Sequence, residues 1–302
     1  MSPYVGRFAP SPTGPLHFGS LVAAIASWLD ARAADGRWLV RIEDVDEPRT
    51  VPGAIDEILR ALEALGLEHD GEVVRQSART ALYQQALERL RSARHVYRCD
   101  CSRREIADSA LRGPEGPIYP GACRGDRDAY RALAAGAPLD CAVRFAIEDG
   151  RVAFDDRVQG HVVQEVAHEV GDFVLRRRDR LFAYQLAVVV DDADQGVTDV
   201  VRGADLLGST GRQVLLQRAL GVPTPRYLHF PVAIDASGEK LSKQTRAQPI
   251  DVREGPRLIA QALRFLGQRA VEMDTPARML AQARAQWDAA RIARATTARM
   301  PA

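Results

Sequence analysis

The residues best suited to chemistry lie near the start of the chain, where a short alternating segment leads into a proline-rich loop and then an apolar run. Pro10, Pro12 and Pro15 fix backbone torsions and remove amide donors, so we expect the loop to keep one shape. Free amides at the start of the next helix, with His17 beside them and Gly19 allowing close approach, suit an anion such as a nucleotide phosphate. The alternative interpretation is a proline-rich connection with a buried histidine.

A second candidate for phosphate chemistry is the polar loop that follows residue 235. It contains Lys240 and Lys243, the only lysines of the chain, whereas every other strongly basic side chain is an arginine. An ammonium group is a compact, mobile point charge and a guanidinium group is a planar fork. Two lysines so close together therefore indicate a specific need for lysine in this loop.

Three of the four cysteines lie in a segment that is rich in glycine and proline and poor in apolar residues. Cys99, Cys101 and Cys123 could hold a structural zinc ion, which would stabilise a segment that has little to bury. Cys141 is available as a fourth ligand, but it alternates with apolar residues along a predicted strand. A packed core thiol is therefore the favoured role for Cys141.

The elements around the opening loop have the pattern of a βαβ unit. Residues 4–9 alternate as a strand, helical spacing continues to about Ala34, and Trp38–Ile42 is predicted as the next strand. Parallel pairing of the two strands through the helix would place Glu43 at the carboxyl end of a strand, beside the opening loop. Further along, Tyr227–Ile234 is predicted as the last strand.

Composition sets broad limits on the class of protein. The chain of 302 residues is 46% hydrophobic and 27% charged, as expected of a soluble globular protein. Its 41 basic and 40 acidic residues give a net charge of +1, which neither indicates nor excludes nucleic acid, because binding depends on local patches. Arg176–Arg180 could contact phosphates or form a solvated turn. No apolar run approaches the roughly 20 residues of a membrane span, and no signal peptide is recognised, so we expect a cytoplasmic protein.

Several segments together resemble a known family. Three segments resemble the two nucleotide-binding signatures of class I aminoacyl-tRNA synthetases, in the form used by glutamyl-tRNA synthetases. They are Arg7–Gly14, His17–Ser20 and Lys240–Gln244. The glutamate-site segments of that family resemble Arg41–Asp44, Tyr184 and Val201–Gly203. The motifs occur in the family's order between about residues 4 and 250.

Two departures refine the resemblance. Ser20 stands where the family's first signature has a second histidine, and Leu241 and Gln244 replace a methionine and a serine of the second signature. The stretch after Lys243 is also shorter than the helical anticodon-reading domain of ordinary glutamyl-tRNA synthetases. The chain thus resembles a truncated, queuosine-modifying branch of the family, in which a tyrosine, here Tyr119, supplies the fourth zinc ligand.

The resemblance implies an α/β fold: a Rossmann-like, doubly wound parallel sheet with an inserted zinc-binding, acceptor-type subdomain and a short helical C-terminal extension. Residues 1–98 and 172–250 would form the two halves of the catalytic domain, the second with the lysine loop. Residues 99–171 would form the inserted subdomain, with its zinc segment at 99–123. Residues 251–302 would be a short helical region without an anticodon-binding domain.

The resemblance also implies a reaction and its residues. The enzyme would activate L-glutamate with ATP and Mg²⁺ and transfer it to queuosine in the anticodon of tRNA(Asp), acting as a monomer. The catalytic residues would be His17 and Lys243. The glutamate-binding residues would be Arg7, Ala9, Ser11, Glu43, Tyr184 and Arg202. The ATP-binding residues would be His17, Gly19, Ser20, Lys240 and Lys243. One structural zinc ion would be held by Cys99, Cys101, Tyr119 and Cys123.

Two other functions fit the same residues. A minimal glutamyl-tRNA synthetase would charge the 3′ end of tRNA(Glu), and a catalytically silent paralogue would only bind tRNA. The residues leave open whether Arg7 or Arg202 pairs with the side-chain carboxylate of glutamate.

Overall fold

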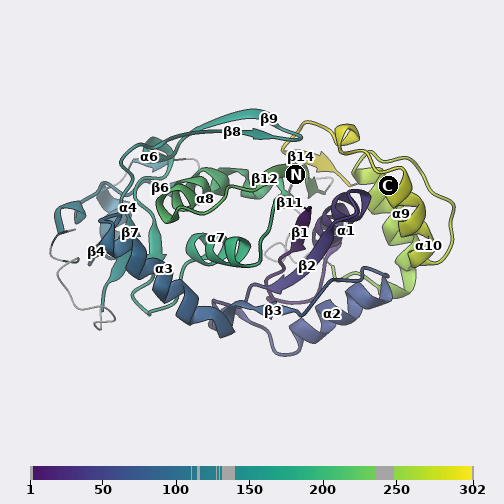
Figure 1. Cartoon of the computed structure of the whole chain (residues 1–302), viewed down its shortest axis with the longest axis horizontal. Coiled ribbons are helices and arrows are strands. Elements are labelled where there is room, and N and C mark those ends of the chain that lie inside the picture. The colour runs from purple at the N-terminus through teal and green to yellow at the C-terminus, as the bar shows by residue number, and fades with distance from the viewer. Residues whose placement is uncertain are drawn as a thin grey trace.

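A computed structural model of the chain describes residues 3–109, 111–113, 116–126, 128, 130, 140–235 and 248–300. The opening βαβ unit has the form predicted from the sequence (Figure 1). Strands β1 (Val5–Phe8) and β2 (Arg37–Ile42) pair in parallel and are joined by helix α1 (Phe18–Ala33). Asp35 adopts a left-handed φ of 49° just after α1, which ends the helix and turns the chain into β2. β3 (Val74–Arg75) extends the sheet beside β2.

A second sheet continues the first one. Its order is β11-β12-β8-β9, with bounds Asp199–Gly203, Arg226–Phe230, Arg151–Asp156 and Gly160–Glu165. β11 and β12 are parallel, and β8 and β9 form an antiparallel hairpin. The amide of Thr198 donates to the carbonyl oxygen of Val5 at 2.9 Å, so the start of β11 lies beside the start of β1. The carboxyl ends of the parallel strands consequently share one edge, where ligands of such folds bind.

A second apolar cluster is built on three helices. α3 (Thr80–Ser92), α7 (Tyr184–Asp194) and α8 (Leu207–Leu220) contribute buried apolar side chains to one cluster. Gly221, with a left-handed φ of 63°, ends α8, as helix-terminating glycines do. In Figure 1, α7 and α8 lie between the parallel strands and the far end of the molecule that carries β4 and β7.

That far end holds a small antiparallel sheet in the order β10-β7-β4. Its strands are Val174–Arg176, Ala142–Phe145 and Val96–Cys99. The shorter elements of the region are α4 (Arg103–Ser109), β5 (Arg112–Gly113), β6 (Gly116–Pro117) and α6 (Val166–Glu169). This sheet contains strands from the expected inserted subdomain, residues 99–171, and from the segments on either side of it. The boundaries of that subdomain therefore remain predictions.

The C-terminal region contains two amphipathic helices, as predicted. α9 (Gly255–Phe265) and α10 (Pro276–Ala285) pack with α1 and α2 (Ala54–Ala64) in one apolar cluster. Met279 of α10 is fully buried there. The C-terminal helices are therefore part of the core that supports the opening unit, and Figure 1 shows them stacked beside α1.

The prediction of one last strand at Tyr227–Ile234 is wrong. Pro231 has no amide hydrogen, and it separates β12 from a new strand, β13 (Val232–Ile234). A further strand, β14 (Thr297–Arg299), pairs in parallel with β13. The end of the described chain thus lies against the strand that leads into the lysine loop.

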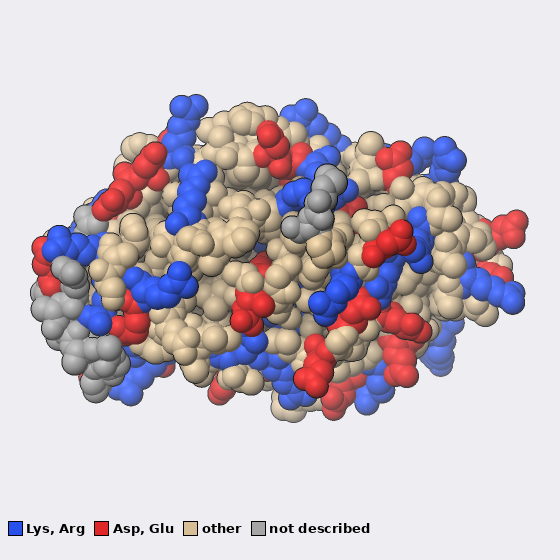
Figure 2. Space-filling view, viewed as in Figure 1, with Lys and Arg blue, Asp and Glu red and all other residues tan. Residues whose placement is uncertain are grey.

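The surface carries both signs of charge. Figure 2 shows arginine side chains interspersed with aspartate and glutamate over the visible face, which agrees with the nearly balanced charge of the sequence. None of the helices in the described part of the chain is both long enough and apolar enough to cross a membrane.

Candidate active site

A cavity of about 720 Å³ lies at the shared carboxyl edge of the parallel strands. Every described residue that the sequence assigned to glutamate or ATP lines it: Arg7, Ala9, Ser11, His17, Gly19, Ser20, Glu43, Tyr184 and Arg202. Lys240 and Lys243 lie outside the described residues, so the structure does not place the second nucleotide signature. The size is ordinary for a site that holds a small ligand.

The opening loop is braced by backbone hydrogen bonds on both sides. The carbonyl oxygen of Pro10 accepts from the amide of Glu43 at 3.0 Å, and that of Pro12 accepts from Val51 at 2.9 Å. Gly14 adopts a φ of 136°, which side chains disfavour, so the loop needs glycine at this point. The predicted stiff loop is therefore held against the end of β2, and Glu43 is brought to the cavity.

His17 is the N-cap of α1. Its Nδ1 accepts a hydrogen bond from the backbone amide of Ser20 at 3.3 Å. The proton of the neutral ring consequently resides on Nε2, which leaves the ring able to donate on that side. Ile250 donates its amide to the carbonyl oxygen of Leu16 at 3.0 Å, so the chain that follows residues 236–247 returns beside His17.

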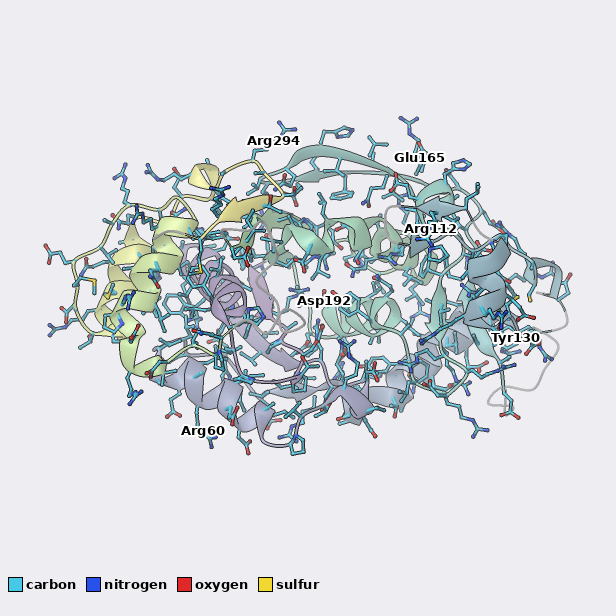
Figure 3. All side chains as sticks on the ribbon, turned by 180° about the vertical axis from the view of Figure 1, so that it is seen from behind. Arg60, Arg112, Tyr130, Glu165, Asp192 and Arg294 are labelled. Carbon is cyan, nitrogen blue, oxygen red and sulfur yellow. The ribbon has the colours of Figure 1, made fainter. Side chains whose placement is uncertain are left out.

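A cluster of arginines and carboxylates lies beside the cavity on the side of β1 and β2, and Arg7 and Glu43 of this cluster line the cavity. Arg41 is fully buried and contacts Asp192 at 2.7 Å, Glu43 at 3.4 Å and Asp191 at 3.7 Å. Arg7 holds the same Asp192 with Nε at 3.2 Å and Nη2 at 3.4 Å. Figure 3 shows Asp192 near the middle of the molecule. Arg7 therefore reaches the cavity from a fixed position, with part of its guanidinium already occupied.

The pKa values of Glu43 and Asp192 are shifted in opposite directions. Burial raises the pKa of Glu43 above the ordinary range, and the nearby Arg41 and Arg7 only partly oppose this shift. Burial acts on Asp192 in the same direction, but Arg7 and Arg41 outweigh it and hold the pKa of Asp192 below its usual value. Glu43 is thus the acid of this cluster that lacks full charge compensation, and a cationic ligand group would supply it.

Arg202 projects from the opposite side, at the end of β11. Its Nε donates to Nε2 of His229 at 2.9 Å, and its Nη2 donates to Oγ1 of Thr210 at 2.9 Å. The Nη1 atom is buried and has no hydrogen-bond partner among the described residues. An unpartnered buried guanidinium nitrogen is costly, so Nη1 would gain from a ligand group that accepts a hydrogen bond, such as a carboxylate.

Sequence reasoning missed several residues of the site. Arg41 lies in a segment that matched the family, but its role as the link between Asp191 and Asp192 was not predicted. His229 and Asp156 were also missed, because their pairing connects different strands. The available signal for Asp191 and Asp192 was their position directly after an apolar run. The sequence offered no signal for the pairing of Asp156 with His229.

The cysteine segment converges as predicted. The Sγ atoms of Cys99, Cys101 and Cys123 all lie within 4.8 Å of one another. The hydroxyl of Tyr119 lies 3.3 Å from Sγ of Cys99 and 3.7 Å from Sγ of Cys101. Ligands about 2.3 Å from a tetrahedral zinc ion are about 3.8 Å apart, so this donor set fits such an ion. Cys141 is not part of this group, and its side chain packs in the apolar cluster of α3 and α7.

The basic segment at Arg176–Arg180 makes contacts within the chain. Arg177 pairs with Asp46 and Asp179, and Arg180 pairs with Asp140. This ion pairing agrees with the interpretation of a solvated turn, although Arg177 also lines the cavity.

Comparison with known proteins gives the family. The family model described as "tRNA synthetases class I (E and Q), catalytic domain" matches residues 4–282. The chain therefore belongs to this family of class I tRNA synthetases, which confirms the resemblance found in the sequence.

Curated relatives are similar over nearly the whole chain. A glutamyl-Q tRNA(Asp) synthetase of Dechloromonas aromatica (strain RCB) is 59% identical over 273 residues, which are 90% of this chain and 88% of the relative. One of Ectopseudomonas mendocina (strain ymp) is 54% identical over 297 residues, which are 97% of this chain and 96% of the relative.

Solved structures show the same fold. A glutamate-tRNA synthetase from Elizabethkingia anophelis superposes with a TM-score of 0.79 at 23% identity, covering 100% of this chain and 68% of that chain. A glutamate tRNA ligase from Elizabethkingia meningosepticum CCUG26117, in complex with its amino acid, gives a TM-score of 0.77 at 24% identity, with 100% and 67% coverage. The chain accordingly has the mixed α/β catalytic fold of the class.

The buried contacts of Asp191 lead us to expect that this residue contributes to the free energy of unfolding. Arg79 pairs with two aspartates, of which Asp191 is fully buried and Asp194 is half exposed. Asp191 also accepts hydrogen bonds from Gln76 and Tyr83, both at 2.8 Å. Asp191→Asn should therefore lower the free energy of unfolding by about 2 to 4 kcal/mol.

The matched control is Asp194→Asn, which should lower the free energy of unfolding by less than about 1 kcal/mol because its ion pair is exposed. Denaturant unfolding followed by tryptophan fluorescence measures both variants. Equal, small losses would contradict the central role given to Asp191.

Proposed function

We propose that this protein forms glutamyl-adenylate from L-glutamate and ATP and then transfers the glutamate to queuosine in the anticodon of tRNA(Asp). Two observations support the proposal: the family to which the chain belongs, and its similarity over nearly their whole length to relatives named glutamyl-Q tRNA(Asp) synthetase. The observation that carries it is the pairing, in one cavity, of a buried guanidinium with an unpartnered nitrogen and a buried acid with a raised pKa. Those two groups suit the carboxylate and the ammonium of an acidic amino acid.

Glutamate would bind between the two sides of the cavity. Its ammonium would pair with Glu43, whose burial favours a cationic partner. Its side-chain carboxylate would pair with Arg202, since the reacting α-carboxylate must remain open to ATP. Glutamine would be rejected because its neutral amide would leave the charge of Arg202 unpaired. Tyr184 and Ser11 would add hydrogen bonds from the cavity wall.

Activation is an in-line substitution at phosphorus. An oxygen of the α-carboxylate forms a bond to the α-phosphorus of ATP, which enters with Mg²⁺, and the bond to the bridging oxygen of pyrophosphate breaks. Amides at the start of α1 and the Nε2 donor of His17 would stabilise the phosphates as charge moves to the leaving group. Lys240 and Lys243 are proposed to follow the departing pyrophosphate, as mobile ammonium groups suit this role.

The transfer step uses the mixed anhydride made in the first step. A hydroxyl oxygen of the cyclopentene-diol of queuosine would attack the acyl carbon, and AMP would leave as the hydroxyl loses its proton to solvent. Orientation of the two reactants is the main contribution that a preformed cavity makes to such a step. The braced loop at Pro10 and Pro12 would hold the adenylate for this attack.

The test supplies labelled glutamate, ATP and tRNA that either contains or lacks queuosine. We expect label only on the queuosine-containing tRNA(Asp), because the acceptor hydroxyl belongs to that base. Label on tRNA(Glu) irrespective of queuosine would overturn the proposal in favour of a minimal glutamyl-tRNA synthetase. A lack of glutamate-dependent pyrophosphate exchange would overturn it in favour of a silent tRNA-binding paralogue.

We also infer that the cysteine group holds one structural zinc ion. Cys99, Cys101 and Cys123 would supply thiolates and Tyr119 the fourth position, in a donor set that fits tetrahedral coordination. The ion would stabilise the segment and take no part in the chemistry, since the cysteine group does not line the cavity.

Metal analysis of purified variants tests this zinc site. The unmodified protein and Cys141→Ala should each contain about one zinc per chain, whereas Cys123→Ala should lose most of it, because a structural site needs all four ligands. The Cys141 variant is the matched control, since that thiol is buried outside the group. Equal zinc contents in the two variants would contradict the assignment.

A further inference from the structure

Arg202 differs from Arg7 and Arg41, the two buried arginines on the side of β1 and β2. Arg7 and Arg41 each contact the carboxylate of Asp192 directly. Within the described part of the chain Arg202 makes no ion pair, and its hydrogen bonds go to an imidazole, a hydroxyl and a backbone carbonyl, all neutral groups. Its side chain is nevertheless buried, with only 5% of its surface exposed. The charge that compensates Arg202 must therefore act from a greater distance.

His229 connects Arg202 to one such carboxylate, Asp156. Arg202 on β11 and His229 on β12 are direct partners in the parallel register, so their side chains lie side by side. Nε of an arginine always donates, and Nε2 of His229 must accept this hydrogen bond at 2.9 Å. The ring proton is thereby fixed on Nδ1, which lies 2.6 Å from Oδ2 of Asp156.

Burial and the neighbouring Arg202 keep this imidazole neutral. Burial is the largest cause that lowers the pKa of His229 to about 4, and the hydrogen bond to Asp156 only partly opposes it. The ring is fully buried and lies stacked on Tyr227 at a centroid distance of 5.9 Å. The neutral ring of His229 thus links the carboxylate of Asp156 to the guanidinium of Arg202 and adds no positive charge of its own.

Asp156 is itself held in one orientation. Its Oδ1 accepts from the amides of Val158 at 3.0 Å, Gln159 at 2.9 Å and His229 at 3.2 Å. Its Oδ2 is left for the imidazole. Burial alone would raise the pKa of Asp156, but these hydrogen bonds and His229 outweigh it and lower the pKa to about 2. The carboxylate is therefore ionised and cannot rotate away.

We propose that Asp156 and His229 are positioning residues that hold Arg202 with its Nη1 directed at the substrate carboxylate. A carboxylate in direct contact with Arg202 would compete with the substrate for the same donors. Placing it one imidazole away stabilises the buried cation and leaves Nη1 available. This inference rests on the proposed activation of glutamate.

The decisive variant is Asp156→Asn. Oδ1 of the asparagine would keep the three backbone contacts, and its Nδ2 would replace Oδ2 and donate to Nδ1 of His229. The ring proton would be forced to Nε2, where it opposes the Nε–H of Arg202, as in the Asp-to-Asn change of a serine protease triad. In glutamate-dependent pyrophosphate exchange, KM for glutamate should rise about ten- to a hundredfold, while KM for ATP should change by less than about threefold.

Two substitutions of His229 separate positioning from packing. His229→Gln can place its Oε1 near the former Nε2 position and still accept from Arg202, so KM for glutamate should stay within about fivefold of the original. His229→Asn can keep the donor to Asp156 but has no acceptor near Arg202, so it should behave like Asp156→Asn. A purely structural role would instead make KM follow the thermal stability of the two variants.

Nitrogen-15 NMR of the histidine rings gives a readout independent of activity. The chain has six histidines, so the signals of His229 can be assigned from the spectrum of His229→Gln. We expect the Nδ1–H tautomer in the unmodified protein and the Nε2–H tautomer in Asp156→Asn.

The outcomes distinguish the two proposals. If the unmodified protein shows no glutamate-dependent exchange, the proposed function fails. If it is active but KM for glutamate is unchanged in Asp156→Asn and His229→Asn, or if its His229 carries the proton on Nε2, the positioning role is overturned.

Discussion

The site depends on one constraint, which is that a buried guanidinium must be held firmly while one of its nitrogens stays unpaired. Arg202 meets this condition because its partners are neutral and fixed by the register between β11 and β12. The ionised Asp156 acts through His229 and never touches the guanidinium. Arg7 and Arg41 show the contrasting arrangement, in which Asp192 occupies the guanidinium directly. The first arrangement favours binding an external anion, and the second favours a rigid wall.

The rest of the chain keeps the two walls in place. The start of β11 is hydrogen-bonded to the start of β1, which fixes the distance between the side of Arg202 and the side of Arg7. The C-terminal helices α9 and α10 pack on α1, and β14 pairs with β13. Segments far apart in sequence thus support the same edge of the sheets. A ligand that joins both walls needs at least two charged groups of opposite sign, as a free amino acid has.

Local sequence patterns predicted local features well. The βαβ unit, the position of Glu43 and the convergence of Cys99, Cys101 and Cys123 were all predicted, because each depends on spacing within one segment. That Tyr119 lies beside the cysteines was expected from the family resemblance alone, since spacing favours cysteine or histidine as a fourth ligand. The Asp156–His229 pair was not predictable, because it joins strands whose register is set by the whole fold. The break at Pro231 was a readable signal that the strand prediction overlooked.

The central claim is that the unpaired nitrogen of Arg202 selects a carboxylate. It is tested most directly by kcat/KM for glutamate and for glutamine in pyrophosphate exchange, in the original protein and in Arg202→Gln, which keeps hydrogen-bonding groups and removes the charge. The account predicts that kcat/KM of the unmodified protein is about 10⁴-fold or more higher for glutamate than for glutamine, as for sites built around a specific polar contact. In Arg202→Gln this preference should be lost, because kcat/KM for glutamate falls. An unchanged preference in Arg202→Gln would contradict the account.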